Sequence, residues 1–138
     1  MSSLEVTSSL RILIWNPQPL GAQILSRVLD NAGHRASVVV TEADALTALE
    51  RNFFDLLIVH QNTPEDMDLA LLKLHRFAHS DEPQLPAIVL VPEADTAVQE
   101  QCRDAGVDII LTLPVRPSQV LDALNDLTSL IQRRRMAV

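Results

Sequence analysis

Five short apolar runs divide the chain, and segments with a helical pattern separate them. The longest run, residues 54–59, is opened by an aromatic residue and followed by His60 and a polar stretch that contains a proline. An apolar run of this length predicts a strand that is buried on both faces, as in parallel sheets. The other predicted strands occupy residues 11–15, 36–40 and 87–91, and a fifth lies within residues 107–113. This alternation predicts an α/β fold with a parallel sheet.

The segments between the strands carry the signals of helix ends. Pro19 and Pro117 fit the first turn of a helix, where the missing N–H group costs nothing. Thr41 is a predicted N-cap, and Gly33 is a predicted left-handed cap at a helix end. An apolar stripe predicts the buried face of the first helix, and its members are Leu20, Ile24, Leu25, Val28 and Leu29. The predicted helices span about residues 19–32, 42–52, 64–77, 95–105 and 117–134.

Right-handed crossovers restrict how such strand–helix units assemble. They predict a doubly wound, flavodoxin-like (βα)5 parallel sheet with strand order 2-1-3-4-5. Residues 1–9 are a predicted loose tail, residues 10–126 the folded domain, and residues 127–138 an extension of the last helix. The arginines at positions 133–135 end that helix, and they are predicted to be solvated.

Composition argues against several classes of protein. The formal net charge of −7 disfavours a binder of duplex nucleic acid, which would have a clustered basic face. The single cysteine, Cys102, cannot form an intrachain disulfide, and no Cys/His cluster has zinc spacing. No apolar stretch approaches the roughly 20 residues of a membrane span, and the amino terminus lacks a signal-peptide pattern. We therefore expect a cytoplasmic protein with no nucleic-acid partner and no membrane span.

His60 stands at the end of the longest predicted strand. In an open parallel sheet, ligands and chemistry gather beyond the carboxyl ends of the strands. Histidine titrates near neutral pH and is a common metal ligand, but nothing beside it in the sequence supports either role. The sequence therefore favours a hydrogen-bonded histidine in a filled pocket.

Several motifs, in order and at matching spacing, resemble the receiver domains of response regulators, the CheY-like domains. The matching segments are residues 12–20, 54–64, 105–108 and 113–115. They resemble, in turn, the first strand and its loop, the phosphoacceptor strand and its turn, the Ala-Gly-Ala turn and the Lys-Pro-Phe motif. The resemblance runs from about Leu10 to Asp126. It implies the fold predicted above, a role in two-component or phosphorelay signal transduction, and a cis peptide bond before Pro114.

The departures from the receiver pattern fall on its chemical positions. By resemblance, Asn16 and Pro17 stand at the positions of the metal-binding carboxylate pair, and His60 stands at that of the phosphoacceptor. Val91 stands at the position of the hydroxyl residue, Leu113 at that of the lysine and Ile110 at that of the aromatic switch. Mg²⁺ prefers carboxylate oxygens, and aspartyl phosphorylation requires a carboxylate nucleophile. A transferring phosphoryl group also requires a neighbouring cation. We therefore expect a degenerate phosphorylation pocket with no catalytic residue, no metal and no cofactor.

Three functions remain open on this evidence. The first is a pseudo-receiver, an interaction or regulatory module that works through protein contacts without phosphorylation. The second is an enzyme with unconventional phosphotransfer or hydrolysis at His60. The third is a small-ligand sensor that uses the altered crevice at the strand ends. The first requires only a fold and a surface, so we expect a non-enzymatic module.

The resemblance also implies a surface for protein partners, formed by the fourth helix, the fifth strand and the fifth helix. With the residues that follow it, the candidate surface comprises Arg103, Asp108, Ile110, Gln119, Asp122, Leu127 and Ile131. The spacing of Leu127 and Ile131 suits a helix–helix seam, so we expect a homodimer. Residues 72–77 resemble receivers inside hybrid sensor kinases. The chain is then either a stand-alone adaptor or part of a larger signalling protein.

Overall fold

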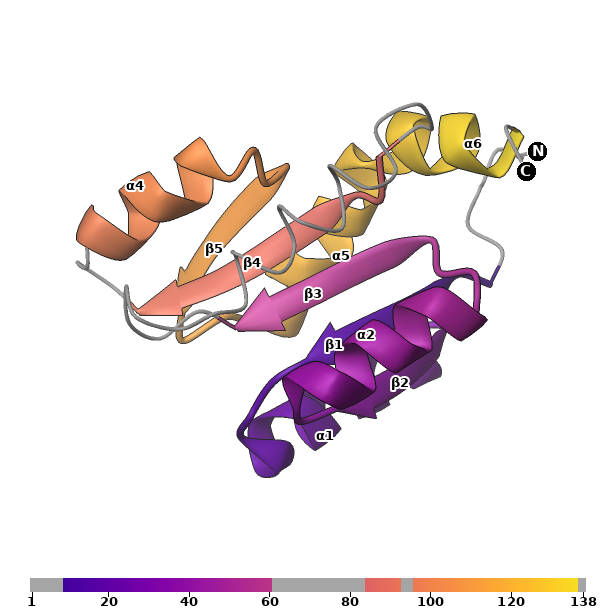
Figure 1. The fold of residues 1–138 in the computed structure, drawn as a ribbon, viewed down its shortest axis with the longest axis horizontal. Helices are drawn as coiled ribbons and strands as arrows, with labels where there is room; N and C mark the ends of the chain where they lie inside the picture. Colours follow the sequence, from indigo (N-terminus) through magenta and orange to yellow (C-terminus); the bar gives the residue numbers. More distant parts are fainter. Residues whose placement is uncertain (1–8, 61–83, 93–95, 137–138) are drawn as a thin grey trace.

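The computed structural model describes residues 9–60, 84–92 and 96–136, so the helix predicted at residues 64–77 lies outside the described residues. Parallel strands form one sheet with the order β2-β1-β3-β4-β5 (Figure 1). The strands are β1 (Arg11–Trp15), β2 (Arg35–Val39), β3 (Leu56–His60), β4 (Ala87–Pro92) and β5 (Ile109–Leu113). The described helices are α1 (Pro19–Asn31), α2 (Glu42–Arg51), α4 (Thr96–Asp104), α5 (Pro117–Asp126) and α6 (Thr128–Met136). The predicted doubly wound fold and its strand order are confirmed.

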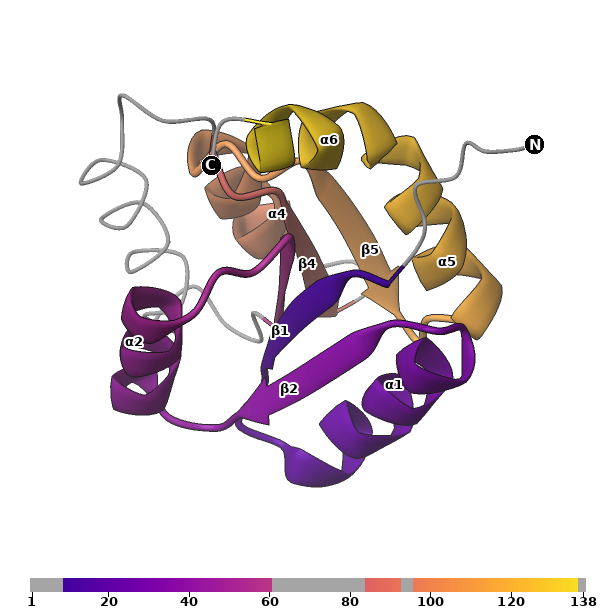
Figure 2. The same ribbon diagram turned by 90° about the vertical axis from the view of Figure 1, so that its right-hand side faces the viewer.

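Helices cover both faces of the sheet, with α1 and α5 on one side and α2 and α4 on the other (Figure 2). Alternate residues of a strand face opposite layers. Ile12 and Ile14 of β1 belong to the apolar cluster that includes α1 and α5. Leu13 and Trp15 belong to the cluster that includes α2 and α4. Because both faces are covered, the central strands are apolar throughout, which explains their continuous runs in the sequence.

The helix ends follow the signals in the sequence. The hydroxyl of Thr41 accepts a hydrogen bond from the backbone N–H of Asp44, at 3.1 Å, and so caps α2. Gly33 and Gly106 follow α1 and α4 with φ angles of 96° and 74°, a region that glycine adopts without strain. The peptide bond between Leu113 and Pro114 is cis, as predicted.

The exposed side of α1 differs from the prediction. Ala22 and Leu29 are fully buried, whereas Leu20 and Ile24 have exposed fractions of 77% and 69%. The predicted stripe joined residues on two adjacent arcs of the helix. The sheet covers only the arc that carries Ala22 and Leu29, which are seven residues apart and share a face. The other arc leaves α1 with apolar side chains in solvent.

The last predicted helix, about residues 117–134, is wrong as a continuous element. The chain turns at Leu127, between α5 and α6, and α6 runs in a different direction from α5 (Figure 2). The turn packs Leu127 and Ile131 into the cluster with Leu10 and Leu29, where their exposed fractions are 4% and 2%. These side chains therefore do not form the predicted intermolecular seam, because burial within the domain already removes them from water.

Candidate functional site

The carboxyl ends of three strands bring together three residues of the predicted phosphorylation pocket. Asn16 follows β1, His60 ends β3 and Leu113 ends β5, and all three line one pocket. Val91 is fully buried on the α2–α4 side of the sheet, and Pro17 is exposed. Among the described residues that line the pocket, neither Val91 nor Pro17 occurs. The five sequence positions are thus only partly assembled into one site.

Asn16 and His60 form the polar part of this site. The His60 Nδ1 atom lies 3.3 Å from the Asn16 Oδ1 atom, which also accepts a hydrogen bond from the backbone N–H of Gln18 at 2.8 Å. An amide oxygen only accepts, so the His60 Nδ1 atom carries the proton in this contact. The Asn16 backbone N–H donates to the carbonyl of Val39 at 3.1 Å, and the residue is buried. Asn16 therefore holds His60 in one orientation across the ends of β1 and β3.

The side-chain donors that the structure describes at these strand ends, Asn16 and His60, do not fit Mg²⁺, the metal that the resemblance to receiver domains implies. Mg²⁺ requires an octahedron of oxygen ligands, usually with one or two carboxylates. At the strand ends, the side-chain oxygen of Asn16 already accepts two contacts, and His60 presents an imidazole. Within the described ranges, no group of three or more His, Cys, Asp or Glu residues is arranged to hold a metal ion.

The pocket has a volume of about 300 Å³ and lies between α1 and the segment that joins β5 to α5. Its walls are mainly apolar. The lining residues are Asn16, Gln18, Gly21, Ile24, Leu25, Val28, His60, Leu90, Leu113, Val115, Arg116, Pro117 and Val120. The described lining residues include one cation, Arg116, and no acid. The site can therefore exclude water from an apolar group and attract a negative charge.

Sequence reasoning did not identify Arg116 or the α1 wall of this pocket. Arg116 follows the cis bond by two residues, and the apolar spacing of the sequence places Ile24 on the predicted buried stripe of α1. The sequence signal for this wall is the number of apolar residues on α1. They cover a wider arc of the helix than the sheet can bury, so some of their side chains lie outside the core. The pairing of α1 with the β5–α5 segment depends on the crossover connections of the sheet.

Some residues of the predicted interaction surface on α4, β5 and α5 are exposed, and others pack or form hydrogen bonds within the domain. Arg103 and Asp122 are exposed, whereas Ile110 is half-buried against the α2–α4 cluster. The carboxylate of Asp108 accepts from the backbone N–H of Ala87 at 2.8 Å. The side-chain oxygen of Gln119 accepts from the backbone N–H of Arg116 at 2.7 Å. The function of this surface stays a prediction.

Comparison with known sequences gives a similarity to one type of signalling protein. No family model matches the chain. The chain is 28% identical over 130 residues to the Sensory/regulatory protein RpfC of Xanthomonas campestris pv. campestris, in two strains. The match covers 94% of this chain and 18% of the relative, so the chain spans less than a fifth of that protein's length.

Comparison with solved structures identifies the fold. A CheY-like receiver domain protein from Methanospirillum hungatei matches with a TM-score of 0.77 and 20% identity, over 91% of this chain and 98% of that chain. The chemotaxis response regulator CheY4 of Vibrio cholerae matches with a TM-score of 0.75 and 21% identity, over 87% of this chain and 99% of that chain. The receiver domain of the Francisella response regulator 1452 matches with a TM-score of 0.74 and 21% identity, over 87% and 97%. The chain has the CheY-like fold of response-regulator receiver domains.

Proposed function

We propose that the chain is a pseudo-receiver of two-component signal transduction, a cytoplasmic module that works through protein contacts without phosphorylation. The observation that carries this proposal is the contact between Asn16 and His60 at the carboxyl ends of β1 and β3. An active receiver has carboxylates at these positions, and here an amide and an imidazole lie in hydrogen-bonding contact. The receiver fold and the similarity to a sensory/regulatory protein support the signalling context.

The chemistry of phosphoryl transfer supports the same proposal. Aspartyl phosphorylation requires a carboxylate nucleophile, and the corresponding position holds His60. The lysine position holds Leu113, whose side chain cannot neutralise the charge that develops on a transferring phosphoryl group. Phosphotransfer at His60 would also lack the carboxylate pair that helps hold Mg²⁺, because Asn16 and Pro17 stand at those positions. The proposed module is therefore not an enzyme.

The exposed apolar side chains favour α1 as a contact surface. Leu20 and Ile24 are one helical turn apart and largely exposed. Soluble proteins tolerate single exposed apolar residues, but a contiguous patch commonly marks an interaction site. Because Leu127 and Ile131 are buried, a homodimer would use α4, β5 and α5 instead, where Arg103 and Asp122 are exposed.

Intact-mass spectrometry tests the absence of phosphorylation. The full chain is incubated with acetyl phosphate and Mg²⁺, and its mass is compared with that of an active receiver treated in parallel. We expect no phosphoryl adduct on the wild type or on the His60→Asp variant, which restores the acceptor but not the metal pair or the lysine. A phosphoryl adduct at His60 would overturn the proposal and support the enzyme instead.

A second measurement tests the role of protein contacts. Partners are captured from an extract of the source organism with the wild type and with a Leu20→Ser/Ile24→Ser variant. We expect the variant to lose a partner that the wild type captures equally well with and without acetyl phosphate. Arg133→Gln provides the matched control, because Arg133 is exposed on α6, away from α1. Capture that requires acetyl phosphate would contradict the proposal.

A further inference from the structure

The pocket between α1 and the β5–α5 segment is open, although the residues that correspond to the receiver's carboxylates and lysine are of other types. Ile24, Leu25 and Val28 of α1 face it from one side, and Leu113 and Val115 face it from the other. Its volume of about 300 Å³ lies at the lower end of the range for small-molecule sites, roughly 300–1,000 Å³. A pocket of this size with apolar walls suits a compact apolar group.

The polar groups of the pocket are few, and they select the head group of a ligand. The Asn16 oxygen is engaged by His60 and by the Gln18 backbone. Arg116 brings the positive charge, and no carboxylate of the described residues forms an ion pair with it. A guanidinium group binds a carboxylate with two parallel hydrogen bonds. The described lining residues include a single arginine, whereas a polyphosphate would require several cations.

We propose that this pocket binds a small monocarboxylate with a compact apolar body, its carboxylate on Arg116 and its apolar part between α1 and Leu113. The pocket then adds a ligand-sensing function to the proposed interaction module. Ile24 belongs both to the pocket wall and to the exposed apolar arc of α1. A bound ligand would therefore reach the α1 surface proposed for partners. The ligand site is independent of the pseudo-receiver proposal, because neither requires the other.

A titration of the full chain with 2-naphthoate, followed by methyl NMR spectra, tests the site. We expect saturable shifts of the methyl groups of Leu113 and Val120, which line the pocket, and smaller shifts at Leu20, which does not line it. Replacing the Arg116 guanidinium in Arg116→Gln should weaken 2-naphthoate binding about tenfold, the effect of losing a charged hydrogen bond. Arg103→Gln removes an exposed arginine on α4 and should leave the affinity unchanged.

Uncharged 2-naphthylmethanol separates the head group from the apolar body. It should bind the wild type more weakly than 2-naphthoate and should bind Arg116→Gln as it binds the wild type. Shifts that do not saturate, or equal affinity of the wild type and Arg116→Gln for 2-naphthoate, would overturn the proposal.

A larger side chain at Gly21, which lines the pocket, should block it. A Cβ atom built at Gly21 meets only the Asn16 amide nitrogen, at 3.8 Å, which is an ordinary contact. Gly21→Leu adds volume to the pocket lining, and a variant whose circular dichroism spectrum matches that of the wild type should no longer bind 2-naphthoate. Gly21→Ala adds a single methyl group and should retain most of the affinity. Unchanged binding by a folded Gly21→Leu variant would place 2-naphthoate elsewhere and contradict the proposal.

Discussion

Arg135 forms a bidentate ion pair with Asp55, which lies 80 residues earlier in the sequence. Its Nε and Nη2 atoms donate to the two carboxylate oxygens at 2.7 and 2.9 Å. The carboxylate is 2% exposed and also accepts from the backbone N–H of Arg11 at 2.8 Å. Arg135 further donates to the carbonyl of Ser9 at 2.9 Å. The hydrogen bond to Asp55 raises the pKa of the Arg135 guanidinium, so the charge is held. The end of α6 is thereby tied to the starts of β1 and β3.

Removal of this ion pair should destabilise the domain. In Arg135→Gln, the buried carboxylate of Asp55 loses its charged partner and keeps the backbone donor of Arg11. Breaking a buried pair is costly, but Arg135 is 37% exposed, so water replaces part of the interaction. We expect a loss of about 1–3 kcal/mol in the free energy of unfolding, measured with urea.

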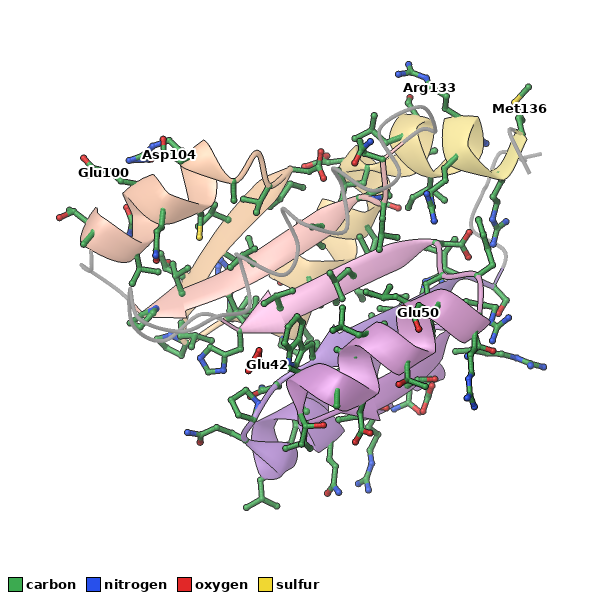
Figure 3. All side chains as sticks on the ribbon, in the orientation of Figure 1. Glu42, Glu50, Glu100, Asp104, Arg133 and Met136 are labelled. Carbon is green, nitrogen blue, oxygen red and sulfur yellow. The ribbon has the colours of Figure 1, made fainter. Side chains whose placement is uncertain are left out.

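Arg133→Gln is the matched control for this measurement. The Arg133 side chain points away from the domain (Figure 3), and its replacement should change the free energy of unfolding by less than about 0.5 kcal/mol. Equal effects of the two variants would show that net charge, not the contact with Asp55, determines the difference.

Burial of Ile131 should make α6 part of the folded core. Ile131→Ala removes apolar volume from the cluster with Leu10 and Leu29, so we expect a loss of about 2–5 kcal/mol in unfolding free energy. Met136→Ala, on the same helix but 86% exposed and pointing into solvent (Figure 3), should be nearly neutral. If Ile131→Ala changed the sedimentation mass and not the stability, the intermolecular seam would be supported instead.

His34 should make the domain less stable in mild acid. The backbone N–H of Leu10 donates to the Nδ1 atom of His34 at 3.2 Å, which requires that atom to be unprotonated. Burial lowers the pKa of His34 below 6.5, although the charge of Asp55 opposes this shift. As pH falls below about 6.5, the unfolded chain binds a proton that the folded chain does not, so the free energy of unfolding decreases.

Urea unfolding at a series of pH values on either side of 6.5 measures this effect. In His34→Gln, which keeps an acceptor for Leu10 but does not titrate, we expect a smaller decrease as pH falls. Comparison of the two chains cancels the contributions of the other titrating groups. An identical pH dependence of wild type and variant would contradict the role assigned to His34.

The two glycines of the α1 region should respond oppositely to alanine. Gly21 lies within α1, and an added Cβ atom has room, so Gly21→Ala should stabilise the domain by about 0.5–1 kcal/mol through helix propensity. Gly33 has a φ of 96°, so Gly33→Ala should destabilise it by about 1 kcal/mol or more. Thermal unfolding of both variants tests the pair. A loss of stability in Gly21→Ala would mean that the site near Asn16 is closed to an added methyl group.

The interpretation of the helix ends and strands required only local sequence. Apolar runs bounded by Pro and Gly predicted the strands, because the central strands β1, β3 and β4 are buried on both faces and have few polar positions. Thr41 predicted its own cap, because the hydrogen bond to Asp44 spans three residues. The resemblance predicted which residues replace the receiver's carboxylates, hydroxyl and lysine. Whether that replacement abolishes phosphorylation stays a prediction.

The sequence by itself determined the five strands, their order in the sheet and the residue types at the strand ends. Only the tertiary structure decided the turn at Leu127, the ion pair between Arg135 and Asp55, and the exposed arc of α1. Periodicity relates only residues that are a few positions apart, so it cannot show that Asp55 pairs with Arg135, 80 residues further along the chain. It also cannot show which of two apolar arcs the sheet covers. Burial depends on the shapes of packed elements, and those shapes exist only after the chain has folded.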